Sequence, residues 1–242
     1  MEDRHVTLSE LDKATERLIA TVGKLTDEDL RVPSRLPGWS RGHVIAHLAR
    51  NADSLWNLLE WARCGVEVSQ YPSDEVRDAG VIASAGRPAA ELREELELSA
   101  ARFAIQARTL PEPAWQVTVR ALAGWGHPAW YTLNRRWREV EAHHADLDAG
   151  YTYADWSPAY VRWELGDILA ALKLDGGLAA GRLRATDLGH DVILGDGPEI
   201  SGTGHQLLGW LTGRSDGSGL GAVQALPAPP TWPLSPAGWR SL

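Results

Sequence analysis

Acidic residues and histidines gather in one short segment, residues 137–148, which reads WREVEAHHADLD. Glu139 and His143 lie four positions apart, so on a helix their side chains lie one turn apart on the same face and can bind one metal ion. Glu141 and His144, three positions apart, could also form such a pair. An ordinary helical ion pair with a second histidine in the core explains the same pattern, and periodicity does not choose among these readings.

A third ligand would have to come from another segment, and residues 42–48, which read GHVIAHL, are the best candidate. His47 lies on the apolar stripe of a predicted helix, with His43 one turn earlier. Two histidines and one carboxylate suit zinc and other divalent first-row ions and leave a position open for water or substrate. A histidine on an apolar face is more often a buried structural residue. The site therefore requires that the helices carrying His47 and Glu139 be neighbours in a bundle.

The first 150 residues are predicted to be helical, because apolar residues recur at helical spacing in four long segments. Ser40 is a natural N-cap for the second of these helices. The predicted helices cover residues 6–24, 40–59, 89–110 and 128–147. The segment 71–77 is predicted to be turn-like and polar, and residues 111–126 to be strand or ordered loop.

The chain changes character after Gly150. Ser157 and Pro158 begin a predicted helix that runs to about Leu174. Pieces with strand character, a short helix and a proline-rich extended tail follow, at residues 178–186, 191–194, 205–212 and 225–233. We therefore expect an α+β protein, with a helical domain over residues 1–150 and a small α+β domain over residues 151–242.

Composition narrows the function classes. The net charge of −8 argues against binding to a phosphate backbone. Cys64 is the only cysteine, which excludes an internal disulfide and favours a reducing compartment. The start of the chain lacks the regions of a signal peptide, and no apolar run approaches membrane-spanning length. We expect a cytoplasmic monomer that binds neither nucleic acid nor membranes.

Several segments, in order along nearly the whole chain, resemble the mycothiol-dependent maleylpyruvate isomerases of actinobacteria, a family within the DinB-like metal-binding superfamily. The segments that carry this resemblance are residues 36–53 (LPGWSRGHVIAHLARNAD), 71–77, 138–147 (REVEAHHADL), 209–214 (GWLTGR) and 226–232. The resemblance implies an N-terminal DinB-like four-helix bundle and a smaller C-terminal α+β domain that closes over the site.

The same resemblance implies that His47, Glu139 and His143 bind the metal. It also implies that the other candidates of these two segments do not bind the metal. They are His43, Glu141 and His144. Arg77 and Arg214 match arginines of the family pattern, which implies that they bind carboxylates of the substrate or polar groups of the thiol cofactor. The chain departs from the pattern at Glu141 and in the tryptophan-containing approach to the fourth helix, residues 121–126.

The implied cofactors are zinc or another divalent metal, and mycothiol. A metal-bound thiol is a thiolate at neutral pH. It would add to the double bond of maleylpyruvate, allow rotation and then be eliminated, so that fumarylpyruvate is released. Arginine side chains would hold the carboxylates and stabilise the developing enolate. Two other classes stay open: an S-transferase or conjugating enzyme in detoxification or natural-product biosynthesis, and a metal-binding protein without catalysis.

Overall fold

The structure, a computed structural model, describes residues 4–222, 225–234 and 236. The chain divides into two compact units, the first ending at Gly150 and the second starting at Tyr151. Long helices dominate the first unit, and the second combines helices with a four-stranded sheet. The predicted α+β fold class is therefore confirmed.

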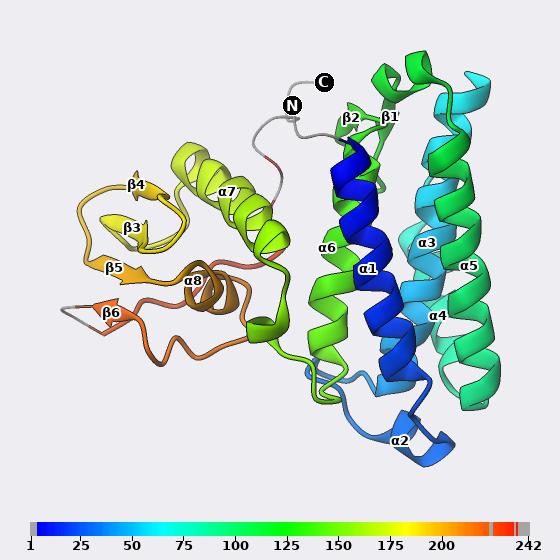
Figure 1. Ribbon diagram of the computed structural model, residues 1–242, viewed down its shortest axis with the longest axis horizontal. Coiled ribbons are helices and arrows are strands. Elements are labelled where there is room, and N and C mark those ends of the chain that lie inside the picture. Colours follow the sequence, from blue (N-terminus) through cyan, green and yellow to red (C-terminus); the bar gives the residue numbers. More distant parts are fainter. Residues whose placement is uncertain (1–3, 223–224, 235, 237–242) are drawn as a thin grey trace. The chain divides into compact units, whose positions relative to one another are not determined.

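Four long helices form the bundle of the first unit (Figure 1). They are α1 (Arg4–Val22), α3 (Arg41–Cys64), α5 (Ala89–Thr109) and α6 (Tyr131–Asp146). Helix α3 packs against α5 and α6, and α1 also packs against α6 and α5, so the four helices enclose a common core. The four predicted helices are confirmed, and the last one starts three residues later than expected because a short strand precedes it.

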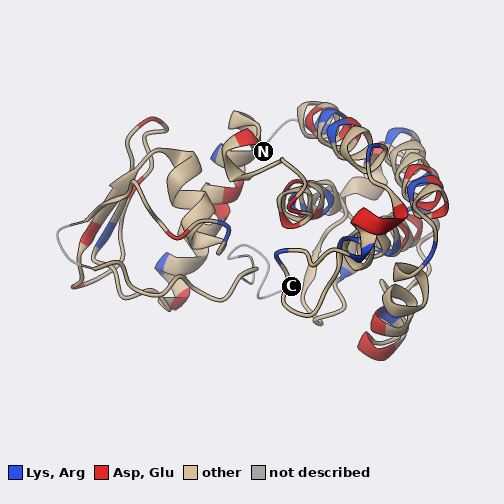
Figure 2. Cartoon of the chain, turned by 90° about the horizontal axis from the view of Figure 1, so that it is seen from below, with Lys and Arg blue, Asp and Glu red and all other residues tan. Residues whose placement is uncertain are grey.

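Apolar residues at helical spacing explain why these segments fold as they do. On α1 the buried positions follow each other three or four residues apart, at Thr7, Leu11, Ala14, Leu18 and Val22. Charged residues of both signs lie along the helices, as the colours of Figure 2 show. Among the described residues, no helix combines the length and hydropathy that crossing a membrane requires.

Short elements connect the long helices. Helix α2 (Asp27–Arg31) begins with a capping box at Thr26, and α4 (Asp74–Ala85) begins after the N-cap Ser73. The prediction of a turn-like segment over residues 71–77 is therefore wrong beyond Ser73. An N-cap serine and two acidic residues in the first turn were the helix signals in that segment.

The segment between α5 and α6 contains a 3₁₀ turn, η1 (Glu112–Gln116), and a small hairpin. Strands β1 (Thr118–Arg120) and β2 (Gly126–Pro128) pair antiparallel, with Val119 opposite His127. This hairpin leads directly into α6, so its residues are attached to the N-terminal end of that helix.

The second unit contains η2 (Tyr153–Asp155), α7 (Pro158–Asp175), α8 (Gly204–Leu211) and a sheet. The sheet has the order β4-β3-β5-β6, and only the β3–β5 pair is parallel. Its strands are β3 (Arg182–Ala185), β4 (Asp191–Ile193), β5 (Glu199–Gly202) and β6 (Gly221–Ala222). The two predicted helices are confirmed to within one residue at each end and the first two strands in shortened form, whereas β5 and β6 were not predicted. Residues 225–233 contain neither helix nor strand, as expected for the proline-rich tail.

Gly42 permits a close contact at the start of α3. A Cβ at this position would lie 2.3 Å from the carbonyl oxygen of Ala85, at the end of α4. We expect Gly42→Ala to destabilise the first unit by about 1–3 kcal/mol through overpacking, although alanine favours the helix. Thermal and urea unfolding measure the effect.

Gly80→Ala is the matched control, because a Cβ at Gly80 in the middle of α4 meets nothing nearer than Arg50 Cδ at 4.0 Å. This variant should gain about 0.5–1 kcal/mol from helix propensity. Equal stability of the two variants would contradict the close-contact argument.

Candidate metal centre

Helix α6 is buried along nearly all of its surface. Thirteen of its residues are buried, and the three that are not are Arg135, Glu139 and His143. These three follow each other at intervals of four, so they form a single stripe along the helix. Glu139 and His143 therefore lie on the one face of α6 that a ligand can approach.

His47 reaches this face from α3, which packs directly against α6. Its Nε2 lies 2.9 Å from Glu139 Oε2, and His143 Nε2 lies 3.3 Å from the same oxygen. The potential ligand atoms of the three residues all lie within 4.8 Å of one another. Residues far apart in the sequence thus converge on one point, as the predicted metal site requires.

Aromatic and apolar neighbours hold His47 in this orientation. The residues on either side of it, Ala46 and Leu48, are completely buried, while His47 is partly exposed. The ring of Trp39 lies against it with the centroids 5.5 Å apart. His43, one turn earlier, instead accepts a hydrogen bond from the backbone N–H of Ser40 through Nδ1 at 3.3 Å.

Asp146 orients the imidazole of His143. The carboxylate is buried, and its Oδ2 lies 2.8 Å from His143 Nδ1, which donates the hydrogen bond. This contact leaves Nε2 facing Glu139 and His47. A carboxylate behind a histidine in this way fixes the ring and increases the basicity of the ligating nitrogen.

The three side chains influence one another's pKa values. Burial lowers the pKa of His47. Burial also favours a protonated Glu139, but the hydrogen bonds from His143 and His47 outweigh this effect and hold its pKa well below the usual range. For His143, burial is outweighed by the hydrogen bonds to Asp146 and Glu139, which raise its pKa to about 9. Without a metal, the cluster therefore carries one extra proton, on His143.

These residues fit a divalent metal ion. Two imidazoles and one carboxylate are a common donor set for first-row ions, and their ligand atoms already converge. A metal would replace the proton of His143 in neutralising Glu139. Three protein ligands leave at least one coordination position for water or another ligand.

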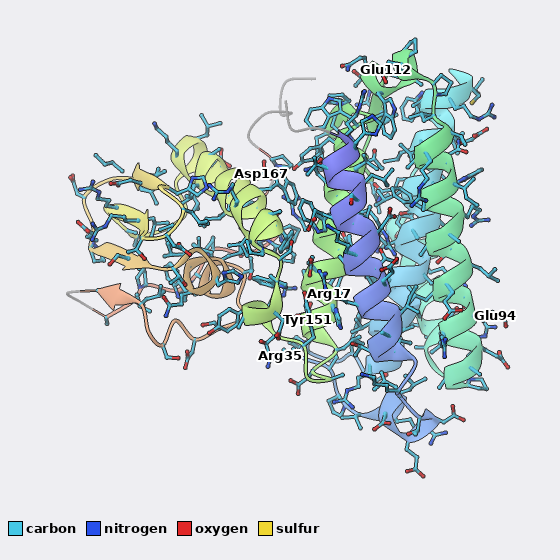
Figure 3. All side chains as sticks on the ribbon, in the orientation of Figure 1. Arg17, Arg35, Glu94, Glu112, Tyr151 and Asp167 are labelled. Carbon is cyan, nitrogen blue, oxygen red and sulfur yellow. The ribbon has the colours of Figure 1, made fainter. Side chains whose placement is uncertain are left out.

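The rival pair lies on another side of α6. Arg17 of α1, labelled in Figure 3, pairs with Glu141 at 2.9 Å, and the Glu141 side chain is buried. His144 Nε2 lies 2.8 Å from Thr21 Oγ1, also on α1. Glu141 and His144 thus join α6 to α1, and neither belongs to the cluster.

Arg77 and Arg214 each already interact with other residues of the protein. Arg77, on α4, pairs with Asp74 at 2.8 Å and with Asp78 at 2.9 Å. Arg214, in the second unit, donates from Nη1 to the carbonyl of Thr212 at 2.8 Å. Its guanidinium also lies 4.2 Å from the ring centroid of Trp232. The roles expected for these two arginines stay predictions.

Sequence reasoning missed two residues of this region. Asp146 follows His143 by three positions, and Arg135 precedes Glu139 by four, so helical spacing places both near the predicted ligands. Neither residue is a candidate ligand itself, so a pattern of metal ligands alone does not select them.

Known proteins resemble the chain in sequence and in structure. The family model of the mycothiol maleylpyruvate isomerase N-terminal domain matches residues 11–148. A crystal structure of a mycothiol-dependent maleylpyruvate isomerase superposes with a TM-score of 0.87 at 28% identity, covering 95% of this chain and 97% of that one. The structure of a histidine-to-alanine mutant of that isomerase gives the same values. No curated protein sequence matches significantly.

Proton release should accompany metal binding. Because the pKa of His143 is raised to about 9, an ion that binds below that pH displaces about one proton. Affinity should therefore rise about tenfold per pH unit between roughly pH 7 and 9, then level off. Competition of Zn²⁺ or Co²⁺ between the protein and an indicator chelator of known pH dependence measures this. An affinity independent of pH over this interval would show that metal binding displaces no proton from His143.

Asp146→Asn should weaken metal binding by about 10–100-fold, because the amide retains the shape but not the charge that supports His143. The affinity should be measured near pH 9, where protons compete little in either protein. Asp148→Asn is the control, since Asp148 is exposed and pairs with Arg35. Unchanged affinity in Asp146→Asn would assign this carboxylate to folding alone.

Proposed function

The chain belongs to the mycothiol maleylpyruvate isomerase family, and on that premise we propose that it is a thiol-dependent metalloenzyme that converts maleylpyruvate into fumarylpyruvate. The observation that carries the proposal is the convergence of His47, Glu139 and His143 on the exposed stripe of α6. Similarity to the crystal structure of a mycothiol-dependent maleylpyruvate isomerase over 95% of the chain supports it.

We propose that His47 Nε2, His143 Nε2 and the Glu139 carboxylate hold a divalent metal ion, with zinc as the first candidate. A metal at this position would lower the pKa of a thiol, so that the thiol binds as a thiolate at neutral pH. Asp146 keeps the His143 ring in the required orientation. The low pKa of Glu139 keeps its carboxylate ionised and available as a ligand.

The thiol must come from outside the protein. Cys64 is exposed at the far end of α3, about 25 Å along the helix axis from His47 at a rise of ~1.5 Å per residue. Mycothiol, the cofactor in the family name, would supply the reactive sulfur. A free exposed cysteine and a thiol cofactor both stay reduced in a reducing compartment. We therefore propose that the protein is cytoplasmic.

The substrate requires cationic groups, because maleylpyruvate carries two carboxylates. We propose Arg77 and Arg214 for these carboxylates or for polar groups of mycothiol. In the first unit, Arg77 uses Nη1 and Nε for Asp74 and Asp78, and its Nη2 contacts no partner among the described residues. Nη2 is therefore available to a ligand, and the two ion pairs hold the guanidinium in place.

A second candidate function is transfer of the thiol to an apolar electrophile. Aromatic rings cluster at the N-terminal end of α6, where the Trp125 centroid lies 5.1 Å from that of His127 and 6.3 Å from that of Tyr131. Such a cluster suits a bulky apolar substrate better than a small dicarboxylate. The same assay distinguishes the two reactions.

Purified protein should contain about one divalent metal ion per chain. His47→Ala should lose both the metal and the mycothiol-dependent formation of fumarylpyruvate, because one of three ligands is removed. His43→Ala should keep both, since the His43 ring contacts Ser40. Elemental analysis gives the metal content, and absorbance with product analysis gives the turnover of maleylpyruvate with and without mycothiol.

The other outcomes decide among the alternatives. A mycothiol adduct that accumulates without fumarylpyruvate would replace the isomerase proposal by the transferase. Bound metal without turnover of either kind would indicate a binding protein. Metal retained at the wild-type level in His47→Ala would refute the proposed ligand set.

A further inference from the structure

Arg135 is the first residue of the exposed stripe on α6, one turn before Glu139. Its neighbours Asn134 and Arg136 are only 3% and 1% exposed, whereas Arg135 is partly exposed. The charge of Glu139 acts on Arg135, but the two side chains form no ion pair within 4.0 Å. Arg135 therefore lies beside the metal ligands without being neutralised by them.

Neutral groups hold the guanidinium of Arg135 in place. Its Nη1 donates to His127 Nε2 at 3.1 Å, and its Nη2 donates to Gln70 Oε1 at 2.9 Å. The guanidinium also lies over the ring of Trp125, 5.1 Å from the centroid. Gln70 Oε1 is itself fixed by the backbone N–H of Leu122 at 3.0 Å. The cation is thus oriented by an amide, an imidazole and an indole.

His127 is built to accept this hydrogen bond. It is completely buried in β2, and its Nδ1 donates to the carbonyl of Pro128 at 2.9 Å, which leaves Nε2 as the acceptor. Burial and the nearby Arg135 lower the pKa of His127 to about 3, so the ring stays neutral. Burial lowers the pKa of Arg135 to about 10, so the guanidinium stays positive at neutral pH.

The oriented guanidinium keeps donors for a ligand. Two of its five N–H groups bind His127 and Gln70, and no carboxylate of the described residues pairs with it. Most other arginines of the bundle surface are paired, as Arg77 is with Asp74 and Asp78. An uncompensated, partly buried cation with free donors is typical of a site that binds an anion.

Tyr71 adds a second donor to this region. Its hydroxyl is buried and meets no hydrogen-bond partner within 3.5 Å among the described residues, although the Ser54 side chain is near enough to lower its pKa. Burial raises its pKa to about 12, so it keeps its proton, and its charge interactions reach both Arg135 and Glu139. A ligand oxygen between Arg135 and the metal ligands would satisfy this hydroxyl.

We propose that Arg135, together with the hydroxyl of Tyr71, forms a carboxylate-binding subsite on the same face as His47, Glu139 and His143. It would take one carboxylate of the substrate while the rest of the molecule lies at the metal centre. Arg135 and Glu139 lie about 6 Å apart along the helix axis, at a rise of ~1.5 Å per residue, a separation that a short dicarboxylate spans. The identity of the dicarboxylate rests on the function proposed above.

Arg135→Gln and Arg135→Lys test the subsite. Loss of the cation should raise KM for maleylpyruvate about 10–100-fold, as removing a charged hydrogen-bond partner does. The metal content and the mycothiol dependence should not change. Lysine, which keeps the charge but not the fork, should restore part of the loss. Tyr71→Phe, which removes only the hydroxyl, should raise KM by a smaller factor, and Arg120→Gln, at an exposed residue of the hairpin, should behave as the wild type.

Equilibrium binding of maleate, followed by calorimetry, separates this inference from the proposed function. If the wild type does not isomerise maleylpyruvate but maleate binds at least 10-fold more weakly to Arg135→Gln, the subsite stands and the proposed function fails. If the wild type isomerises and Arg135→Gln shows the KM of Arg120→Gln, the subsite is refuted and the function stands. Should Arg135→Gln not fold, the comparison rests on Arg135→Lys and Tyr71→Phe, and a wild-type KM in both refutes the subsite.

Discussion

A buried arginine fixes how the two helices of the candidate centre face each other. Arg136 of α6 donates from Nη1 to the carbonyl of Leu48 and to Asn51 Oδ1 of α3, both at 2.8 Å. Leu48 follows His47 directly, and Arg136 precedes Glu139 by less than one turn. These hydrogen bonds therefore hold the two helices in the register that brings His47 to Glu139. Because Arg136 is almost completely buried, a shifted register would leave its charge without partners, at a high energetic cost.

Helix α6 separates two kinds of polar residue by face. Toward α1 it places Glu141 and His144, whose partners Arg17 and Thr21 complete a structural contact. On its partly exposed side lie Arg135, Glu139 and His143. Arg135 keeps N–H donors for other molecules, and Glu139 and His143 keep atoms that could bind a metal. The same helix thus stabilises the bundle with one set of charges and presents a candidate reaction centre with the other.

Within the candidate centre, acidic and basic side chains compensate one another's charge. Glu139 is surrounded by two histidines, and His143 is further supported by Asp146. A proton on His143 compensates the carboxylates when no metal does. The cluster can therefore be a stable part of the fold and a candidate set of ligands at once, since exchanging the proton for a metal ion would leave no buried charge unpaired.

Local periodicity predicted much of the first unit. The four long helices follow from apolar spacing and from caps such as Ser40, because these signals act within a few residues. Helix α4 was missed, since its first turn is polar and begins in a segment with proline and serine. Strand β6, with two residues, is too short for an alternating pattern, and β5, which reads EISG, has a single apolar residue, so neither produced a strand signal.

The sequence by itself determined which residue types lie one turn apart on α6, and the family resemblance selected Glu139 and His143 from them. Spacing along one helix cannot decide which side of that helix stays uncovered, since burial depends on neighbours distant in the chain. Packing of α1 against one side of α6 and of α3 against another decided this, and it placed His47 within 2.9 Å of Glu139. Only the tertiary structure brought Arg135 to His127 and Gln70, because their contacts join an adjacent hairpin and a loop near α4 to the start of α6.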